Sequence, residues 1–212
     1  MKTKAIVLIG IMAVMMSGCL VKSLHSFYDE SDVIYKPELT GNWLDDDSSK
    51  WVISRYSFAR GFLNGDSLLD NSYLAEMYED TAKPSRFNVH LFKVDGILYL
   101  DFMPIRDKGE QEFYEIHLVP AHSLARVRFD SHDRMTISWF NEEWLNKMFE
   151  ENRVKISHEV ILSDDYGYGK QYVLTASTSE LKKFIVKYGN DPNAFKDEDN
   201  KNFFYLKLNR TK

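Results

Sequence analysis

The stretch "SRFNVHLFKVDGILYLDFM", residues 85–103, decides the fold class of this 212-residue chain. Apolar and polar side chains alternate from Phe87 to Leu91, and a period of two places successive side chains on opposite faces of a β-strand. The dipeptide Asp95-Gly96 then interrupts the pattern, and Asp-Gly favours a two-residue hairpin turn. The stretch therefore predicts two antiparallel strands joined by a tight turn.

The same period continues through most of the chain after Gly41. It predicts further strands near 50–58, 72–80, 113–120, 123–130, 134–140, 155–162, 171–175 and 202–209. Two segments have helical spacing instead: 141–151, which Asn141 can cap, and 177–188, where Ser177 and Glu180 have capping-box spacing. We therefore expect a mainly β protein, either an antiparallel lipocalin-like barrel or a strongly curled sheet of about nine or ten strands, with two short α-helices.

The N-terminus has the pattern of a secretory signal. Lys2 and Lys4 precede an apolar run, and small residues follow it. The run is about a dozen residues long, whereas a helix that spans a bilayer needs about 20. We therefore predict a signal peptide over 1–18, a lipidated N-terminus and tether or entry segment over 19–40 (with Leu20–Ser26 as a short tether), and one β-rich domain over 41–212.

The end of the signal, Met16-Ser17-Gly18-Cys19, resembles the lipobox of bacterial lipoproteins. The resemblance implies cleavage between Gly18 and Cys19, a diacylglycerol thioether on the Cys19 sulfur, and acylation, such as palmitate, on the new amine. Leu20 in the next position implies the outer membrane of the cell envelope. The alternative is a buried N-terminal helix with an ordinary core cysteine, but a helix apolar on all sides needs a surrounding core.

The composition of the chain limits the classes of partner that we expect. The formal net charge is −5 and Cys19 is the single cysteine. An acidic chain lacks the basic surface that nucleic-acid binding requires, so no nucleic-acid partner is expected. The predicted partners are the membrane, through lipid on Cys19, together with a small apolar ligand or an envelope protein.

Residues Gly41-Asn42-Trp43 resemble the Gly-x-Trp motif that opens lipocalin barrels. Asp165-Tyr166 resembles the second lipocalin motif more weakly, and a helix followed by one last strand is also the lipocalin order. The resemblance implies that Trp43 plugs the closed end of a barrel. No counterpart of the arginine in the third lipocalin motif is recognised in the sequence.

Two blocks, "LVPAHSLARVRF" (118–129) and "LTASTSELKKFIVKYGNDPNAF" (174–195), are similar to a family of bacterial lipoproteins that has no assigned activity. This resemblance implies a lipoprotein and brings no substrate or reaction with it.

Aromatic residues make up 14% of the chain and are concentrated in the predicted strands. Small barrels often bind ligands at their mouths, in cavities lined by such side chains. The candidate ligand-binding residues are Trp51, Phe87, Tyr99, Phe113 and Trp139, together with Phe92 and Phe102. The alternative is that these rings simply fill the core.

The histidine, serine and acidic residues of the chain do not predict a catalytic or metal-binding site. His90, His117 and His158 could meet inside a barrel, but scattered histidines are the favoured interpretation, because zinc needs three or four converging ligands. His122 and Ser123 are adjacent, so their side chains point apart on a strand. The acidic runs 45–47 and 197–199 lack the spacing of a calcium loop and are interpreted as solvated loops. We expect no catalytic residue, metal or cofactor.

Two functions remain, with an enzyme the least favoured class. The first is a lipid-anchored envelope protein that binds a small apolar or amphipathic ligand in its barrel. The second is a non-catalytic accessory subunit with a solid core, which docks a partner through the 141–151 helix or the acidic loops.

Overall fold

The computed structural model describes residues 20–46, 48–56, 71–79, 83–105, 117–163, 169–198 and 204–211. The predicted signal peptide, the cleavage site Gly18–Cys19, the candidate Phe113 and the motif Asp165-Tyr166 lie outside these residues.

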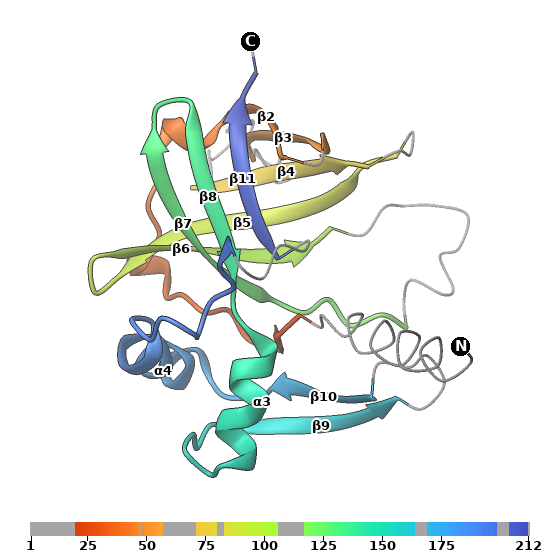
Figure 1. The fold of residues 1–212 in the computed structure, drawn as a ribbon, viewed down its shortest axis with the longest axis vertical. Helices are drawn as coiled ribbons and strands as arrows, with labels where there is room; N and C mark the ends of the chain where they lie inside the picture. The colour runs from red at the N-terminus through yellow and green to blue at the C-terminus, as the bar shows by residue number, and fades with distance from the viewer. Residues whose placement is uncertain are drawn as a thin grey trace, which may run out of the picture.

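Eight antiparallel strands form a closed barrel, which confirms the predicted fold class (Figure 1). The strands are β2 (Gly41–Leu44), β3 (Lys50–Arg55), β4 (Ser72–Tyr78), β5 (Ser85–Val94), β6 (Ile97–Pro104), β7 (Ser123–Ser131), β8 (Arg134–Trp139) and β11 (Tyr205–Arg210). Each of the first seven pairs with the next, and β11 closes the barrel between β8 and β2. The Gly-x-Trp residues are themselves strand β2, whereas we expected them to precede the first strand.

The β5–β6 hairpin has the predicted register and turn. Asp95 and Gly96 both have positive φ, 53° and 85°, as a tight primed turn requires. Leu91 pairs with Leu100 and Val89 with Phe102, so their side chains share the inner face. The alternation read from the sequence thus places the apolar side of this hairpin in the barrel core.

The barrel interior is a packed cluster of apolar residues contributed by every strand. Its most deeply buried large side chains are Trp43, Tyr73, Leu91, Leu100, Met135 and Ile137. Complete burial of one such side chain stabilises the fold by about 1.5–3 kcal/mol.

A second layer is built mainly from the chain between β8 and β11. It contains α3 (Glu142–Glu150), β9 (His158–Ser163), β10 (Gly169–Leu174) and α4 (Thr178–Tyr188), and Figure 1 shows it gathered on one side of the barrel. Both helices begin as predicted. Asn141 accepts a hydrogen bond from the Glu143 backbone N–H at 3.1 Å, and Ser177 and Glu180 form a capping box.

This second layer covers the outer face of β5 and β6. Phe92 and Tyr99 point away from the barrel core and pack with the α4 residues Leu181 and Ile185 in a separate apolar cluster. Strand β6 is consequently covered on both faces, and its four residues from Tyr99 to Phe102 are all buried.

The N-terminal segment, which includes the predicted tether Leu20–Ser26, packs against the rest of the fold. Strand β1 (Lys22–Ser23) pairs in parallel with β10 and extends β9–β10 to a three-stranded sheet. Val21 and Phe27 are fully buried. The chain then passes through two short 3-10 turns, η2 (Glu30–Asp32) and η3 (Pro37–Leu39), before it enters β2.

The predicted strand over 113–120 has no support in its described part. Residues 117–120 are not in a strand and their side chains are exposed. Leu118 and Val119 are 45% and 74% exposed.

Candidate functional site

Four aromatic rings gather at the end of the barrel where β3 and β5 begin and where β6 and β8 end. Trp51 and Trp139 have ring centroids 6.5 Å apart, and Trp139 and Phe102 lie 5.2 Å apart. Phe102 meets Phe87 edge to face at 6.0 Å. We call these four residues the aromatic end. All four, Trp51, Phe87, Phe102 and Trp139, are among the predicted ligand-binding residues.

Trp51 carries the polar group of the aromatic end. The residue is 4% exposed, and its indole Nε1 has no hydrogen-bond partner among the described residues. An indole N–H is a donor only, and leaving a buried donor unsatisfied costs about 1–3 kcal/mol. The aromatic end therefore contains a buried donor that an oxygen acceptor from outside the chain could satisfy.

Tyr99 and Phe92 do not line this site. The Tyr99 ring stacks on Phe92 at 5.5 Å and contacts Phe195 at 5.9 Å, on the outer face of the barrel wall. The prediction that Tyr99 faces a barrel cavity is therefore wrong. The physical reason is register: Leu100 and Phe102 take the inner face, so Tyr99 and Asp101, which alternate with them, point outward.

Toward the other end of the barrel, Trp43 is buried beneath Arg210, which the sequence did not reveal. The Arg210 guanidinium lies 4.2 Å from the Trp43 ring centroid. It donates 2.7 Å hydrogen bonds to the carbonyls of Glu38 and Thr40. Trp43 Nε1 donates to the Leu39 carbonyl at 3.1 Å, so the indole at this end is satisfied.

Gly41 has a physical reason to be glycine at this end of the barrel. Its φ is +146°, a region that side chains rarely adopt, and a Cβ there would collide with the Arg210 guanidinium. The first residue of the Gly-x-Trp motif thus makes room for the arginine that covers the third.

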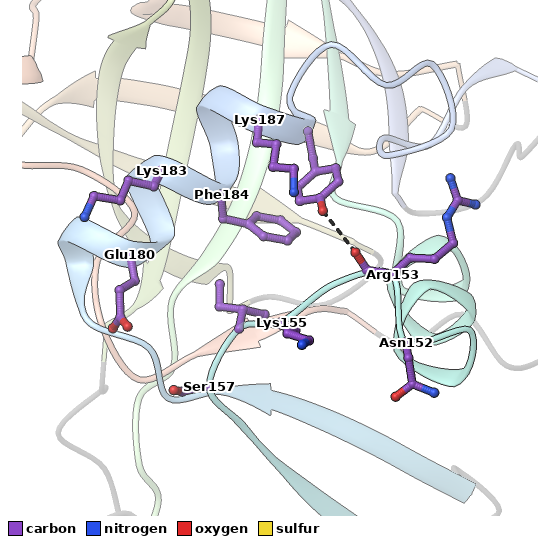
Figure 2. A pocket seen from close by; sticks show the side chains of 10 residues that line it. Asn152, Arg153, Lys155, Ser157, Glu180, Lys183, Phe184 and Lys187 are labelled. Carbon is purple, nitrogen blue, oxygen red and sulfur yellow. Dashed lines mark hydrogen bonds between the residues drawn. The ribbon is translucent and has the colours of Figure 1, made fainter.

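A cavity of about 670 Å³ lies between α4 and the chain before β9, outside the barrel. Four basic residues line it: Arg153, Lys155, Lys183 and Lys187. Figure 2 shows that Lys183 and Arg153 point away from the space above Phe184, so the four charges do not converge on one point. The Tyr188 hydroxyl bridges one side by donating to the Arg153 carbonyl at 3.2 Å. This cavity lacks a focused binding group.

The histidines have structural partners and do not cluster. His122 Nδ1 lies 2.7 Å from Oδ1 of Asp101, a carboxylate that is 1% exposed and whose Oδ2 accepts the Phe27 backbone N–H at 2.9 Å. His122 thus helps to hold the N-terminal segment on the barrel. His90 stacks on Tyr28, and His158 packs on Phe149.

No group of three or more side chains suited to holding a metal ion occurs within the described residues. In the same part of the chain, no helix has the length and apolar character needed to cross a bilayer.

The aromatic end was predictable in part. Trp51, Phe87 and Trp139 could be chosen from strand position and residue type, but their convergence depends on barrel closure by β11. The unsatisfied Trp51 donor and the Arg210–Trp43 stack have no local sequence signal.

Comparison with known proteins adds no relative: no family model, no curated protein and no solved structure matches this chain.

Proposed function

We propose that this protein is a lipid-anchored, non-catalytic component of the bacterial cell envelope that binds a small amphipathic molecule at the aromatic end of its barrel. The observation that carries the proposal is the buried Trp51 indole N–H, which has no acceptor among the described residues and lies within a group of aromatic rings.

The arrangement of the aromatic end indicates which kind of ligand would fit. Phe87, Phe102 and Trp139 offer ring faces and edges to an apolar body, and Trp51 Nε1 offers one hydrogen bond to an oxygen. Removing about 100 Å² of apolar ligand surface from water contributes about 2.5 kcal/mol. Because the rings contact one another, at least one of them must turn to admit the ligand.

Substitution of Trp51 by Phe tests the proposal, because it keeps a ring and removes the donor. We expect Trp51→Phe to lower ligand retention about fivefold, the effect of one hydrogen bond worth about 1 kcal/mol. Native mass spectrometry of the protein extracted from its own membrane, followed by lipid extraction, measures retention. Stability to urea should hold or rise, because a buried unsatisfied donor has been removed.

The matched control is Trp144→Phe, a buried indole in the second apolar cluster, which should leave retention unchanged. The proposal fails if wild-type protein carries no bound molecule, or if Trp51→Phe only lowers stability.

The sequence 16–19 and the path of the chain after it support the proposed anchor. Strand β1 begins at Lys22, three residues after Cys19, and three extended residues span about 10 Å. Lys22 Nζ donates to Gln171 Oε1 at 3.1 Å, and Gln171 pairs with Ile161, which is 49% exposed. A lipid on Cys19 would therefore hold this sheet close to the membrane surface.

Substitution of Cys19 tests the anchor. We expect Cys19→Ala to leave the precursor uncleaved and to abolish incorporation of radiolabelled palmitate, since the acceptor thiol is gone. Ser17→Ala is the control, because a small residue is retained there and processing should continue. Normal processing and membrane attachment of Cys19→Ala would contradict the proposal.

A second candidate, the accessory subunit with a solid core, is favoured by a different observation. The four rings of the aromatic end contact each other, and Leu118 and Val119 are exposed on the connection that leads into β7. In-cell cross-linking from position 119 would then recover one reproducible envelope protein, and ligand extraction would recover nothing.

A further inference from the structure

The outer wall of the barrel over β7, β8 and β11 presents a row of polar side chains at matched positions. Arg126 pairs with Ser138 across β7–β8, and Ser138 pairs with Tyr205 across β8–β11. Their neighbours Val127, Ile137 and Leu206 belong to the barrel core, so alternation turns the three polar side chains outward.

All three of these residues carry side-chain donors that have no acceptor among the described residues. Arg126 is half-buried, and its guanidinium lies 4.6 Å from the Phe195 ring centroid. Among the described residues, no carboxylate or carbonyl accepts from this guanidinium, and the hydroxyls of Ser138 and Tyr205 have no hydrogen-bond partner. The short side chain of Ser138 lies between the longer side chains of Arg126 and Tyr205, so the row is lowest at its centre.

These residues line a cavity of about 610 Å³. Lys196, Arg128 and Asp197 also line the cavity, and Arg128 Nε is paired with Asp130 Oδ1 at 2.8 Å. Lys196 is 3% exposed, and its Nζ pairs at 3.3 Å with Glu143, whose side chain is 65% exposed. Among the described residues, Arg126 is thus the one cation of the lining without a carboxylate partner, and it lies beside the two unsatisfied hydroxyls.

We propose that this outer cavity, over β7, β8 and β11, is a binding site for a phosphate group, with Arg126, Ser138 and Tyr205 as its ligating side chains. A guanidinium presents a planar fork of donors that matches phosphate oxygens, and charge-assisted hydrogen bonds are about twice as strong as neutral ones. The serine hydroxyl donates from the floor and the tyrosine hydroxyl from the opposite wall. The site is separate from the aromatic end and does not depend on it.

Titration of the full-length protein with inorganic phosphate, followed by amide NMR shifts and isothermal calorimetry, tests this site. We expect saturable shifts at 126, 138 and 205, and tighter binding at pH 7.5 than at pH 5, because phosphate carries more negative charge at the higher pH. Arg126→Gln should weaken binding about tenfold or more, and Ser138→Ala about threefold.

Two further variants are needed in case Arg126→Gln disturbs the contact with Phe195. Arg126→Lys retains the positive charge but loses the planar guanidinium, so we expect it to bind phosphate at an intermediate strength. Arg134→Gln lies on the same β-hairpin but outside the cavity lining, so we expect it to bind phosphate as the wild type does. The proposal is overturned if no saturable shifts occur, if Ser138→Ala and Arg126→Lys both bind normally, or if acetate binds as tightly as phosphate.

Discussion

At the scale of single residues, the end of the barrel that holds Trp43 depends on Arg210. Its side chain spans three separate parts of the chain: it stacks on Trp43, bonds the carbonyls of Glu38 and Thr40, and contacts the His132 carbonyl at 3.3 Å. One guanidinium therefore satisfies backbone acceptors that would otherwise lose their partners at this end.

We expect Arg210→Ala to lower the free energy of unfolding by about 2–4 kcal/mol, since it removes charged hydrogen bonds and a cation–π contact. Urea denaturation followed by tryptophan fluorescence measures this. Arg134→Ala, at an exposed position of the same barrel, should change stability by less than about 0.5 kcal/mol. Equal losses for the two variants would show that Arg210 has no special role.

Residues with a local signature could be predicted, and residues that act over long range could not. Asn141, Ser177 and Glu180 were recognisable because a helix cap involves neighbours in sequence. Arg210 was not, because its partner Thr40 lies 170 positions earlier. The unsatisfied indole of Trp51 was also hidden, because a missing partner leaves no pattern in the sequence.

At the scale of elements, the contact between α4 and β6 shows how the second layer fits on the barrel. Helix α4 ends at Gly189, which has ordinary helical dihedrals, φ −62° and ψ −19°. A Cβ at Gly189 would collide with the hydroxyl of Tyr99. This glycine is therefore needed for space and not for a left-handed conformation.

We expect Gly189→Ala to destabilise the protein by about 1–3 kcal/mol, the usual cost of overpacking. In a Tyr99→Phe background the cost should fall, because the colliding oxygen is absent, so the two changes are not additive. Thermal unfolding of the four proteins in this cycle measures the coupling. Asn190→Ala is the control, and strict additivity would contradict the proposed contact.

The strands of the barrel were largely predictable from the sequence. The layer of helices and strands that packs on the outside of the barrel was not. Strand β5 and the turn at Asp95 follow from a period of two and a turn dipeptide. The burial of both faces of β6 has a signal that we did not use: "ILYLDFM" is nearly continuously apolar, which is typical of strands covered on both sides. Strand β1 could not be predicted, because two residues are too few to show a period.

At the scale of the whole molecule, two apolar clusters share one wall. The barrel cluster contains Tyr73, and the second cluster contains Tyr99 on the opposite side of the same sheet. Burial raises the pKa of Tyr73 and of Tyr99 to about 12, above the ordinary value of 10.0. Each core thus holds one phenol that must stay neutral.

Alkaline solution should therefore weaken both clusters together. Because the folded pKa of each phenol lies above its unfolded value, its stabilisation is complete below about pH 10 and is lost between about pH 10 and 12, at about 2–3 kcal/mol for each tyrosine. Urea midpoints measured from pH 8 to 12 should fall in this window. Tyr99→Phe should show a smaller fall, and an unchanged fall would contradict the assignment.

The pairing of β11 with β2 also determines when the molecule can finish folding. Residue 210 stands opposite residue 43, so the barrel closes only after β11 has emerged and can pair with β2. Until then β2 and β8 each present an open edge, and unpaired strand edges are the surfaces through which incomplete sheets aggregate. Closure over so long a sequence separation is also slow compared with local hairpin formation. The period between emergence of β8 and arrival of β11 is thus when this chain most needs a chaperone.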